Sequence, residues 1–139
     1  MAQTEFQLKV LTPALELVAT QVSEVILPAH DGEVGILAAH GNFVGILGTG
    51  VLKYVSKGDD YWLMVSDGVF EVRNGELTVL ADVGENAKGV NVDAAKQKEL
   101  ELEKVVFEKS AHDSDYGYIR TEYDRARARI EAHRRTELH

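Results

Sequence analysis

The segment Asp67–Asp82 reads Asp-Gly-Val-Phe-Glu-Val-Arg-Asn-Gly-Glu-Leu-Thr-Val-Leu-Ala-Asp, and the rest of the fold is built around it. The dipeptides Asp67-Gly68 and Asn74-Gly75 predict turns, and Asn-Gly tolerates the positive φ angles of a tight hairpin. Apolar and polar residues alternate on both sides of Asn74-Gly75, which predicts two paired strands with one inward face. The inward positions are Phe70, Val72, Leu77 and Val79. Because an isolated hairpin is at best marginally stable in water, other strands must cover this one.

Residues 4–82 are a series of short runs rich in β-branched and aromatic residues, separated by turn signals. The clearest of these signals are Asp31-Gly32, Gly48-Thr49-Gly50 and Lys57-Gly58-Asp59-Asp60. Many short strands with frequent turns predict an all-β sandwich or a flattened barrel.

The sequence changes character after Asp82. Residues 84–89 read as a polar linker, and from Val92 the chain is rich in strong helix formers. Asn91 or Asp93 can cap a first helix. A second helix follows a break at residues 110–115, and its apolar residues recur at spacings of three and four. They are Tyr116, Ile119, Tyr123, Ala126, Ile130 and His133. The short connection predicts an antiparallel helical hairpin packed seam to seam.

The composition argues against several classes of protein. A length of 139 residues with 45% hydrophobic residues allows one domain, or one domain with a small appendage, and a substantial core. The lack of cysteine excludes disulfides and thiolate chemistry. A net charge of −8 argues against a general nucleic-acid binder. No apolar run approaches the roughly 20 residues that span a bilayer, and we find no signal-peptide pattern.

Charge is distributed unevenly along the chain. Residues 1–88 carry twelve acids and five bases, whereas residues 89–139 carry eleven acids and ten bases. Six arginines lie in the last helix: Arg120, Arg125, Arg127, Arg129, Arg134 and Arg135. Three of them recur every seven residues and predict an outer stripe, with Arg125 and Arg129 beside it. This stripe is either a solvated helix face or a surface that binds carboxylates.

Three motifs could carry chemistry, and each has a simpler structural interpretation. Gly45–Gly50 has glycines like a phosphate loop, but it lacks the Gly-Lys-Ser/Thr ending and reads as a turn. The group His30, Asp31 and His40 could form an acid–base or metal site, although both histidines lie in turn-like segments. The group His112, Asp113 and Asp115 could bind a metal, but helix capping explains the same residues. The residues alone therefore favour a non-enzymatic interaction module with no metal.

The sequence resembles the epsilon subunit of bacterial F-type ATP synthase, which is called delta in mitochondria. The resemblance covers nearly the whole chain. The most specific motifs are Gly32-Glu33-Val34-Gly35-Ile36-Leu37 with His40 after it, Gly68-Val69-Phe70-Glu71-Val72 and Leu77-Thr78-Val79-Leu80-Ala81-Asp82. His112-Asp113-Ser114-Asp115-Tyr116, followed by Glu122, Ala126 and Ala128, is similar to the start of the family's second helix.

The resemblance implies an α+β chain with two parts. Residues 1–88 would form a flattened antiparallel β-sandwich of about ten strands, and residues 89–139 an antiparallel two-helix hairpin. It implies a rotor subunit of the central stalk, which couples the catalytic head to the membrane ring and is not itself catalytic. The sandwich would bind the gamma subunit and the ring, and the helices would inhibit ATP hydrolysis when they extend toward the alpha and beta subunits. The chain would lie on the cytoplasmic face of the bacterial inner membrane, peripheral to it and without insertion, and would bind no nucleic acid.

The resemblance also assigns contacts by position. Gly32, Glu33 and Val34 would contact the rotor ring, and His40, Gly41 and Asn42 the gamma subunit. The contact with the catalytic subunits would be made by Ser110, Arg120, Arg125, Arg127 and Arg129. The loop after His40 lacks a proline that many members carry, so its backbone is expected to differ.

Some members of the family bind ATP through an Ile-Asp-x-x-Arg-Ala motif and arginines of the second helix. Here Asp93 and Arg127 match, but Lys96 and Gln97 replace the Arg-Ala pair, and Glu131 stands in place of an arginine. We therefore expect no cofactor and weak or absent ATP binding, because a carboxylate repels phosphate. The alternative function is a stand-alone binding module or a small hydrolase that uses His30, Asp31 and His40.

Overall fold

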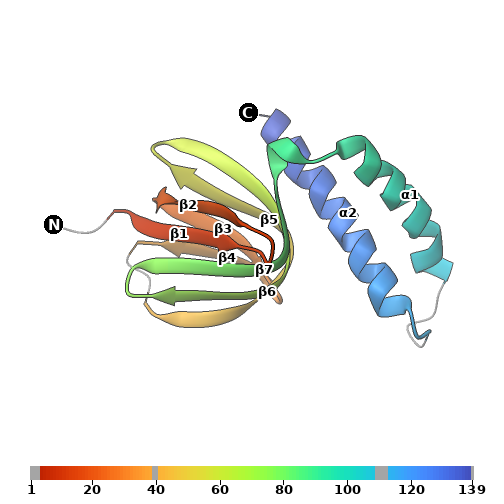
Figure 1. The fold of residues 1–139 in the computed structure, drawn as a ribbon, viewed down its shortest axis with the longest axis horizontal. Coiled ribbons are helices and arrows are strands. Elements are labelled where there is room, and N and C mark those ends of the chain that lie inside the picture. The colour runs from red at the N-terminus through yellow and green to blue at the C-terminus, as the bar shows by residue number, and fades with distance from the viewer. Residues whose placement is uncertain (1–3, 39–40, 109–112, 139) are drawn as a thin grey trace.

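A computed structural model describes residues 4–38, 41–108 and 113–138. It contains seven β-strands, a short 3₁₀ helix and two α-helices (Figure 1). The strands are β1 (Phe6–Leu11), β2 (Glu16–Val22), β3 (Glu24–Ala29), β4 (Gly32–Leu37), β5 (Phe43–Ser56), β6 (Asp59–Arg73) and β7 (Glu76–Asn86). The helices are η1 (Ala87–Gly89), α1 (Val92–Glu108) and α2 (Tyr116–Glu137).

The strands form one sheet in the order β2-β1-β7-β6-β5-β3-β4. The sheet folds over itself into two layers, and the helices lie at one end of the sandwich that results (Figure 1). All neighbouring strands are antiparallel except β1 and β7, which are parallel. The predicted β-sandwich followed by two helices is therefore confirmed, with seven strands in the described residues instead of about ten.

The predicted inward face of the opening hairpin is also confirmed. Phe70, Val72, Leu77 and Val79 are at most 4% exposed and belong to one apolar core between the layers. The Asn74-Gly75 turn has the positive φ angles that the sequence predicts, 50° and 77°. The same core includes Leu8 and Val10 of β1, which pair with β7.

The strand count differs because two predicted turns lie inside strands. Asp67-Gly68 was expected to begin a hairpin, yet β6 continues through it, with φ angles of 59° and 129°. The pairing register with β7 is the same on both sides of the dipeptide. Gly48-Thr49-Gly50 lies within β5 in the same way. The segments on the two sides of each predicted turn are therefore halves of one long strand.

At these internal glycine segments the alternation changes, so that the other set of alternating residues faces the core. In the first half of β6, Leu63 and Val65 face the core between the layers, whereas Trp62 and Met64 belong to a second apolar cluster on the other side. Beyond Gly68 the even-numbered Phe70 and Val72 face the core instead. A single sheet can thus supply the sandwich interior and also a platform for a helix.

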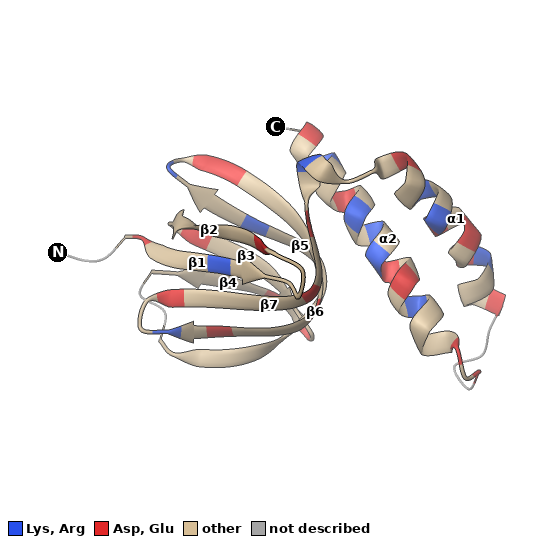
Figure 2. Ribbon diagram, viewed as in Figure 1, with Lys and Arg blue, Asp and Glu red and all other residues tan. Residues whose placement is uncertain are grey.

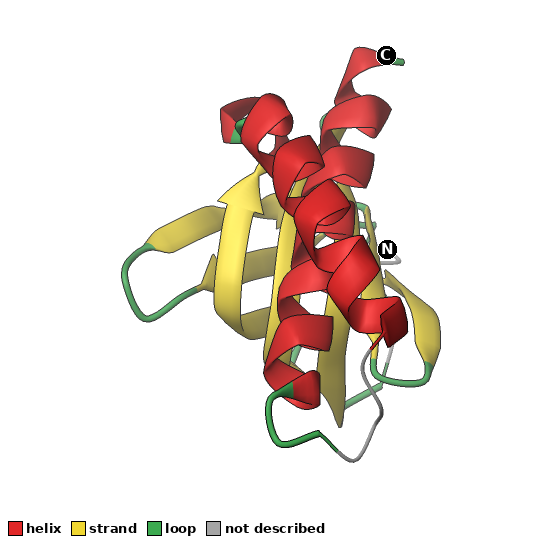
Figure 3. Cartoon of the chain, turned by 90° about the vertical axis from the view of Figure 1, so that its right-hand side faces the viewer, coloured by secondary structure: helices red, strands yellow, loops and turns green. Residues whose placement is uncertain are grey.

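The helix α2 lies on that platform, and α1 packs on α2 (Figures 1 and 3). The second cluster, which we call the docking interface, consists of Trp62, Met64, Ala87, Ala128 and Ala132. Small side chains on α2 allow its backbone to approach the strands closely. The predicted helices are confirmed, but residues 84–89 are not a simple linker, since they end β7 and form η1.

The helix starts differ in how they are capped. At α1 the side chain of Asn91 accepts a hydrogen bond from the backbone N–H of Ala94 at 3.0 Å, so Asn91 and not Asp93 is the cap. At α2, Asp115 occupies the N-cap position without a side-chain capping bond. The capping that we expected for Asp115 is therefore not formed, although the chain does begin its helix there.

Candidate functional site

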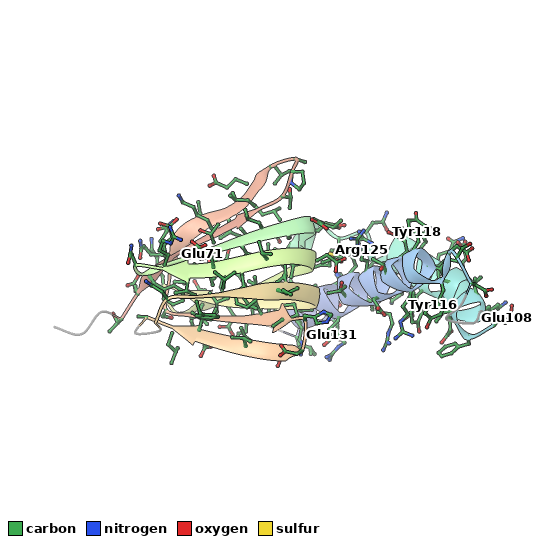
Figure 4. The ribbon with its side chains drawn as sticks, turned by 90° about the horizontal axis from the view of Figure 1, so that it is seen from below. Glu71, Glu108, Tyr116, Tyr118, Arg125 and Glu131 are labelled. Carbon is green, nitrogen blue, oxygen red and sulfur yellow. The ribbon has the colours of Figure 1, made fainter. Side chains whose placement is uncertain are left out.

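Arg125 joins α2 to the sandwich. Its Nε donates to Ser66 Oγ at 2.7 Å, and its terminal nitrogens lie 3.1 Å from Asp67 Oδ2 and 3.3 Å from Glu122 Oε1. Ser66 is fully buried and also shares a 2.8 Å hydrogen bond with Thr49. The positive φ of Asp67 helps to place this acceptor beside α2, and Figure 4 shows Arg125 between the helix and the sandwich.

Arg129 makes a second connection one helical turn later. Its Nε donates to Glu85 Oε1 of β7 at 2.6 Å, and both side chains are partly buried. The expectation that Arg125 and Arg129 lie beside an outer stripe is therefore wrong in this conformation. The helical spacing was correct, but the alanines of the docking interface turn this side of α2 toward the sheet.

Arg120 and Arg127 keep exposed side chains, at 44% and 59%, although Arg127 is directed toward α1. Both guanidinium groups lie within 6 Å of the ring centre of Tyr123, at 5.8 and 5.6 Å. Arg120 also pairs with Asp124 on its own helix, which raises the pKa of Arg120, while Arg127 lies 3.7 Å from Glu99 of α1. Acidic and basic residues alternate along the visible side of both helices (Figure 2). Ser110, the other residue assigned to this contact, lies outside the described residues.

A polar cavity of about 790 Å³ lies between the sandwich and the helices. Its lining includes more acids than bases: Glu33, Asp67, Glu99, Asp124 and Glu131 against Arg127 and Arg135. Of the two residues matched to ATP binding, Arg127 lines this cavity and Asp93 is not among its described lining residues. Hydrogen bonds from Arg134 and Arg135 lower the pKa of Glu131 to about 2, so this carboxylate is ionised at neutral pH. An acidic lining disfavours a triphosphate, and weak ATP binding stays a prediction.

The residues assigned to the rotor ring are the first three of β4, directly after the turn that joins it to β3. Gly32 has a φ of 136°, which only glycine adopts readily, and Glu33 is exposed beside it. Val34 is partly buried and packs against the core. Glu33 is therefore held exposed at the start of a paired strand.

The residues assigned to the gamma subunit lie at the other end of the sandwich. Asn42 Oδ1 accepts a 2.9 Å hydrogen bond from the backbone N–H of Asn74, which ties the loop to the tip of the β6–β7 hairpin. Gly41 is exposed. His40 lies outside the described residues.

An exposed apolar row beside this loop is absent from the sequence-based expectations. Ile46, Val69 and Leu80 are direct neighbours across β5, β6 and β7, and they are 62%, 42% and 48% exposed. Val44, 67% exposed, lies two residues from Ile46 on the same face of β5. Directly paired residues share one face of a sheet, so these side chains form one surface, which we call the apolar row. The signal was present in residues 43–47, where both alternating positions are apolar.

The structure gives little support to a hydrolytic site. His30 and Asp31 are both exposed at the β3–β4 turn, and His40 lies outside the described residues. Within the described ranges, no cluster of three histidine, aspartate or glutamate side chains could hold a metal ion. His112, the third member of the alternative metal group, also lies outside them. No described helix is long and apolar enough to cross a membrane.

Comparison with known proteins links the chain to one family. Residues 5–87 match the family model for the β-sandwich domain of the ATP synthase delta/epsilon chain. The ATP synthase epsilon chain of Solibacter usitatus is 41% identical over 90 residues, which cover 65% of this chain and 67% of that protein. The ATP synthase epsilon chain of Syntrophomonas wolfei is 32% identical over 133 residues, which cover 95% of this chain and 96% of that protein.

Solved structures show the same fold. A chain in the cryo-EM structure of the Euglena gracilis mitochondrial ATP synthase aligns with a TM-score of 0.76 and 16% identity, covering 99% of this chain and 83% of the other. A chain in the central stalk and c-ring structure of the Tetrahymena thermophila mitochondrial ATP synthase aligns with a TM-score of 0.62 and 14% identity. That alignment covers 94% of this chain and 97% of the other.

Proposed function

This chain belongs to the ATP synthase delta/epsilon family, and we propose that it is a rotor subunit in the central stalk of a bacterial F-type ATP synthase. In this role the subunit links the catalytic head to the membrane ring during ATP synthesis and carries out no chemistry of its own. It would be peripheral to the cytoplasmic face of the inner membrane. Residues 1–88 would act as the binding unit and residues 89–139 as a regulatory arm.

The apolar row is the observation that carries this proposal. Ile46, Val69 and Leu80 expose neighbouring side chains on the half of the sheet that α2 leaves open. Contiguous apolar surface on a soluble protein indicates an interface. The partner of this surface would be the gamma subunit, which would also contact the adjoining loop of Gly41 and Asn42.

The β3–β4 turn would supply the contact with the rotor ring. Glu33 is exposed in β4, just after the tight turn from β3, so it could reach a polar partner without distortion of the sheet. The ring and the gamma subunit would then bind different parts of one rigid sandwich, as torque transmission requires.

The helices would regulate ATP hydrolysis when they leave the sandwich. Arg120 and Arg127 are exposed in the docked form and could meet acidic segments of the alpha and beta subunits. Arg125 and Arg129 become accessible only on release, because the sandwich holds them now. Replacing all four arginines would disturb docking and partner contact at once. The double variant Arg120→Ala with Arg127→Ala changes only the two exposed arginines, so it gives the cleaner test of inhibition.

Co-purification followed by an ATPase assay tests the function. The tagged chain should capture a gamma subunit from solubilised native membranes, and its removal from the complex should raise ATP hydrolysis. Deletion of residues 110–139 should raise hydrolysis while leaving gamma bound. A chain that purifies without a gamma subunit and turns over a substrate by itself would instead support the hydrolase alternative.

A further inference from the structure

Two arginines of α2 and their acceptors on the sandwich form what we call the latch: Arg125 with Ser66 and Asp67, and Arg129 with Glu85. We propose that the two halves are unequal and that the Arg129–Glu85 half decides whether α2 stays docked. The regulatory meaning of this inference rests on the proposed function, but the latch itself is a property of the isolated chain.

The Arg125 half of the latch loses little interaction free energy when α2 leaves the sandwich. Glu122, three residues earlier on the same helix, already lies 3.3 Å from Arg125 and stays with it after release. The side chain of Asp67 is 46% exposed, so water can replace the arginine. Ser66 keeps its hydrogen bond with Thr49. Each group that Arg125 leaves behind therefore has a substitute partner.

The Arg129 half has no such substitute within the described residues. Its ion pair is with Glu85 alone, at 2.6 Å, and the two side chains are 25% and 35% exposed. Arg125 is shielded from water as well, at 17% exposure, so the two halves differ in the partners that remain after release and not in burial. Release separates these two charges, and neither gains a protein partner in exchange.

The apolar contacts of the docking interface are small, so the Arg129–Glu85 ion pair can be a large part of the free energy that keeps α2 docked. From α2 it includes only Ala128 and Ala132, which each bury little surface against Trp62 and Met64. Arg129 lies between these two alanines in the sequence, so its ion pair with Glu85 borders the apolar contact of α2 with the sheet.

Distance measurements between two spin labels on the full chain test the proposal. The chain has no cysteine, so Glu16→Cys on β2 and Tyr118→Cys on α2, both exposed, give two unique labelling sites. We expect one main distance in the parent and a second, longer distance after release. Arg129→Gln should raise the ratio of released to docked chains about tenfold, and Arg125→Gln no more than about threefold.

Arg134→Gln is the matched control, because Arg134 pairs with Glu131 on its own helix and should leave the ratio unchanged. The exchanged pair Glu85→Arg with Arg129→Glu should restore the docked distance. Equal effects of Arg129→Gln and Arg125→Gln, or a failure of the exchanged pair to restore docking in a folded chain, would overturn the unequal latch. Because no gamma subunit is present, this result is independent of the co-purification test.

Discussion

The interior of the sandwich and the docking interface under α2 are built in different ways. The interior is filled by large aliphatic side chains such as Leu8, Leu63 and Leu77, all at most 1% exposed. The docking interface receives only alanines from α2 and is bordered by two arginine–carboxylate pairs. Burial of large apolar groups stabilises by about 25 cal/mol per Å², whereas exposed ion pairs contribute about 0–1 kcal/mol each. The comparison indicates a sandwich that stays folded and an arm that can leave it.

A cavity in the sandwich interior should have the largest effect on stability. Leu77→Ala removes a fully buried side chain from the core, and we expect a loss of about 3 kcal/mol in the free energy of unfolding. Leu100→Ala on the outer side of α1 is the control, because Leu100 is 62% exposed and should change stability by less than about 0.5 kcal/mol. Urea denaturation measures both. Similar losses in the two variants would contradict the comparison.

The point where β6 exchanges faces should be the next most sensitive position. At Gly68 a Cβ atom would collide with the backbone carbonyl oxygen of Leu80, and the φ of 129° is unfavourable for other residues. We expect Gly68→Ala to cost about 2–3 kcal/mol. Gly32→Ala has a similar φ of 136° with no atom within 4 Å of the added Cβ, so it should cost only about 1 kcal/mol. Both variants carry the cost of the unfavourable φ, so the difference between their losses in unfolding free energy measures the cost of the collision at Gly68. Equal losses would show that β6 shifts to avoid the collision.

Removal of the arm should leave a folded sandwich. A chain truncated after Lys88 should unfold cooperatively, with a stability reduced by about 2 kcal/mol because Met64 and Trp62 become exposed. Trp62 is the only tryptophan, so its fluorescence should shift to longer wavelength on truncation. An unfolded fragment would show that residues 1–88 depend on the helices and would refute the two-part description.

The smallest expected effect on stability comes from the ion pairs within α2. The pKa of Glu131 is lowered from 4.5 to about 2 by hydrogen bonds from Arg134 and Arg135, so its ionised form favours the folded helix. That contribution is complete above pH 4.5 and is lost as the pH falls toward 2. Since the side chain is 37% exposed, solvent screening limits it to about 1 kcal/mol or less. Thermal melts followed by circular dichroism should lose part of their pH dependence in Glu131→Gln, and an unchanged pH dependence would contradict this contribution.

Local patterns predicted most of the elements. Alternation located the inward face of the β6–β7 hairpin, Asn74-Gly75 located its turn, and the three–four spacing located α2. Patterns of this kind depend on near neighbours in the sequence, so the chain itself contains the information. The resemblance to known epsilon subunits supplied the proposed function, and the comparisons confirmed the family.

The sequence did not show which side of each element meets a distant one. Asp67-Gly68 has the composition of a turn, and only pairing with β5 and β7 on both sides reveals a kink inside a continuous strand. Arg125 and Arg129 look like surface residues until Ser66 and Glu85 are brought beside them. The apolar row was missed for the same reason, since Ile46, Val69 and Leu80 become neighbours only through sheet register.

The binding of the isolated chain to its cognate gamma subunit, measured by calorimetry, tests the central claim most directly. Ile46→Asp combined with Leu80→Asp should weaken binding about 100-fold or more, because two carboxylates would be buried in an apolar contact. Leu100→Asp combined with Phe107→Asp places the same charges on exposed apolar sites of α1 and should leave the affinity unchanged. Normal gamma binding by the sheet variant, or loss of binding by the helix variant alone, would contradict the assignment of the open sheet face to gamma.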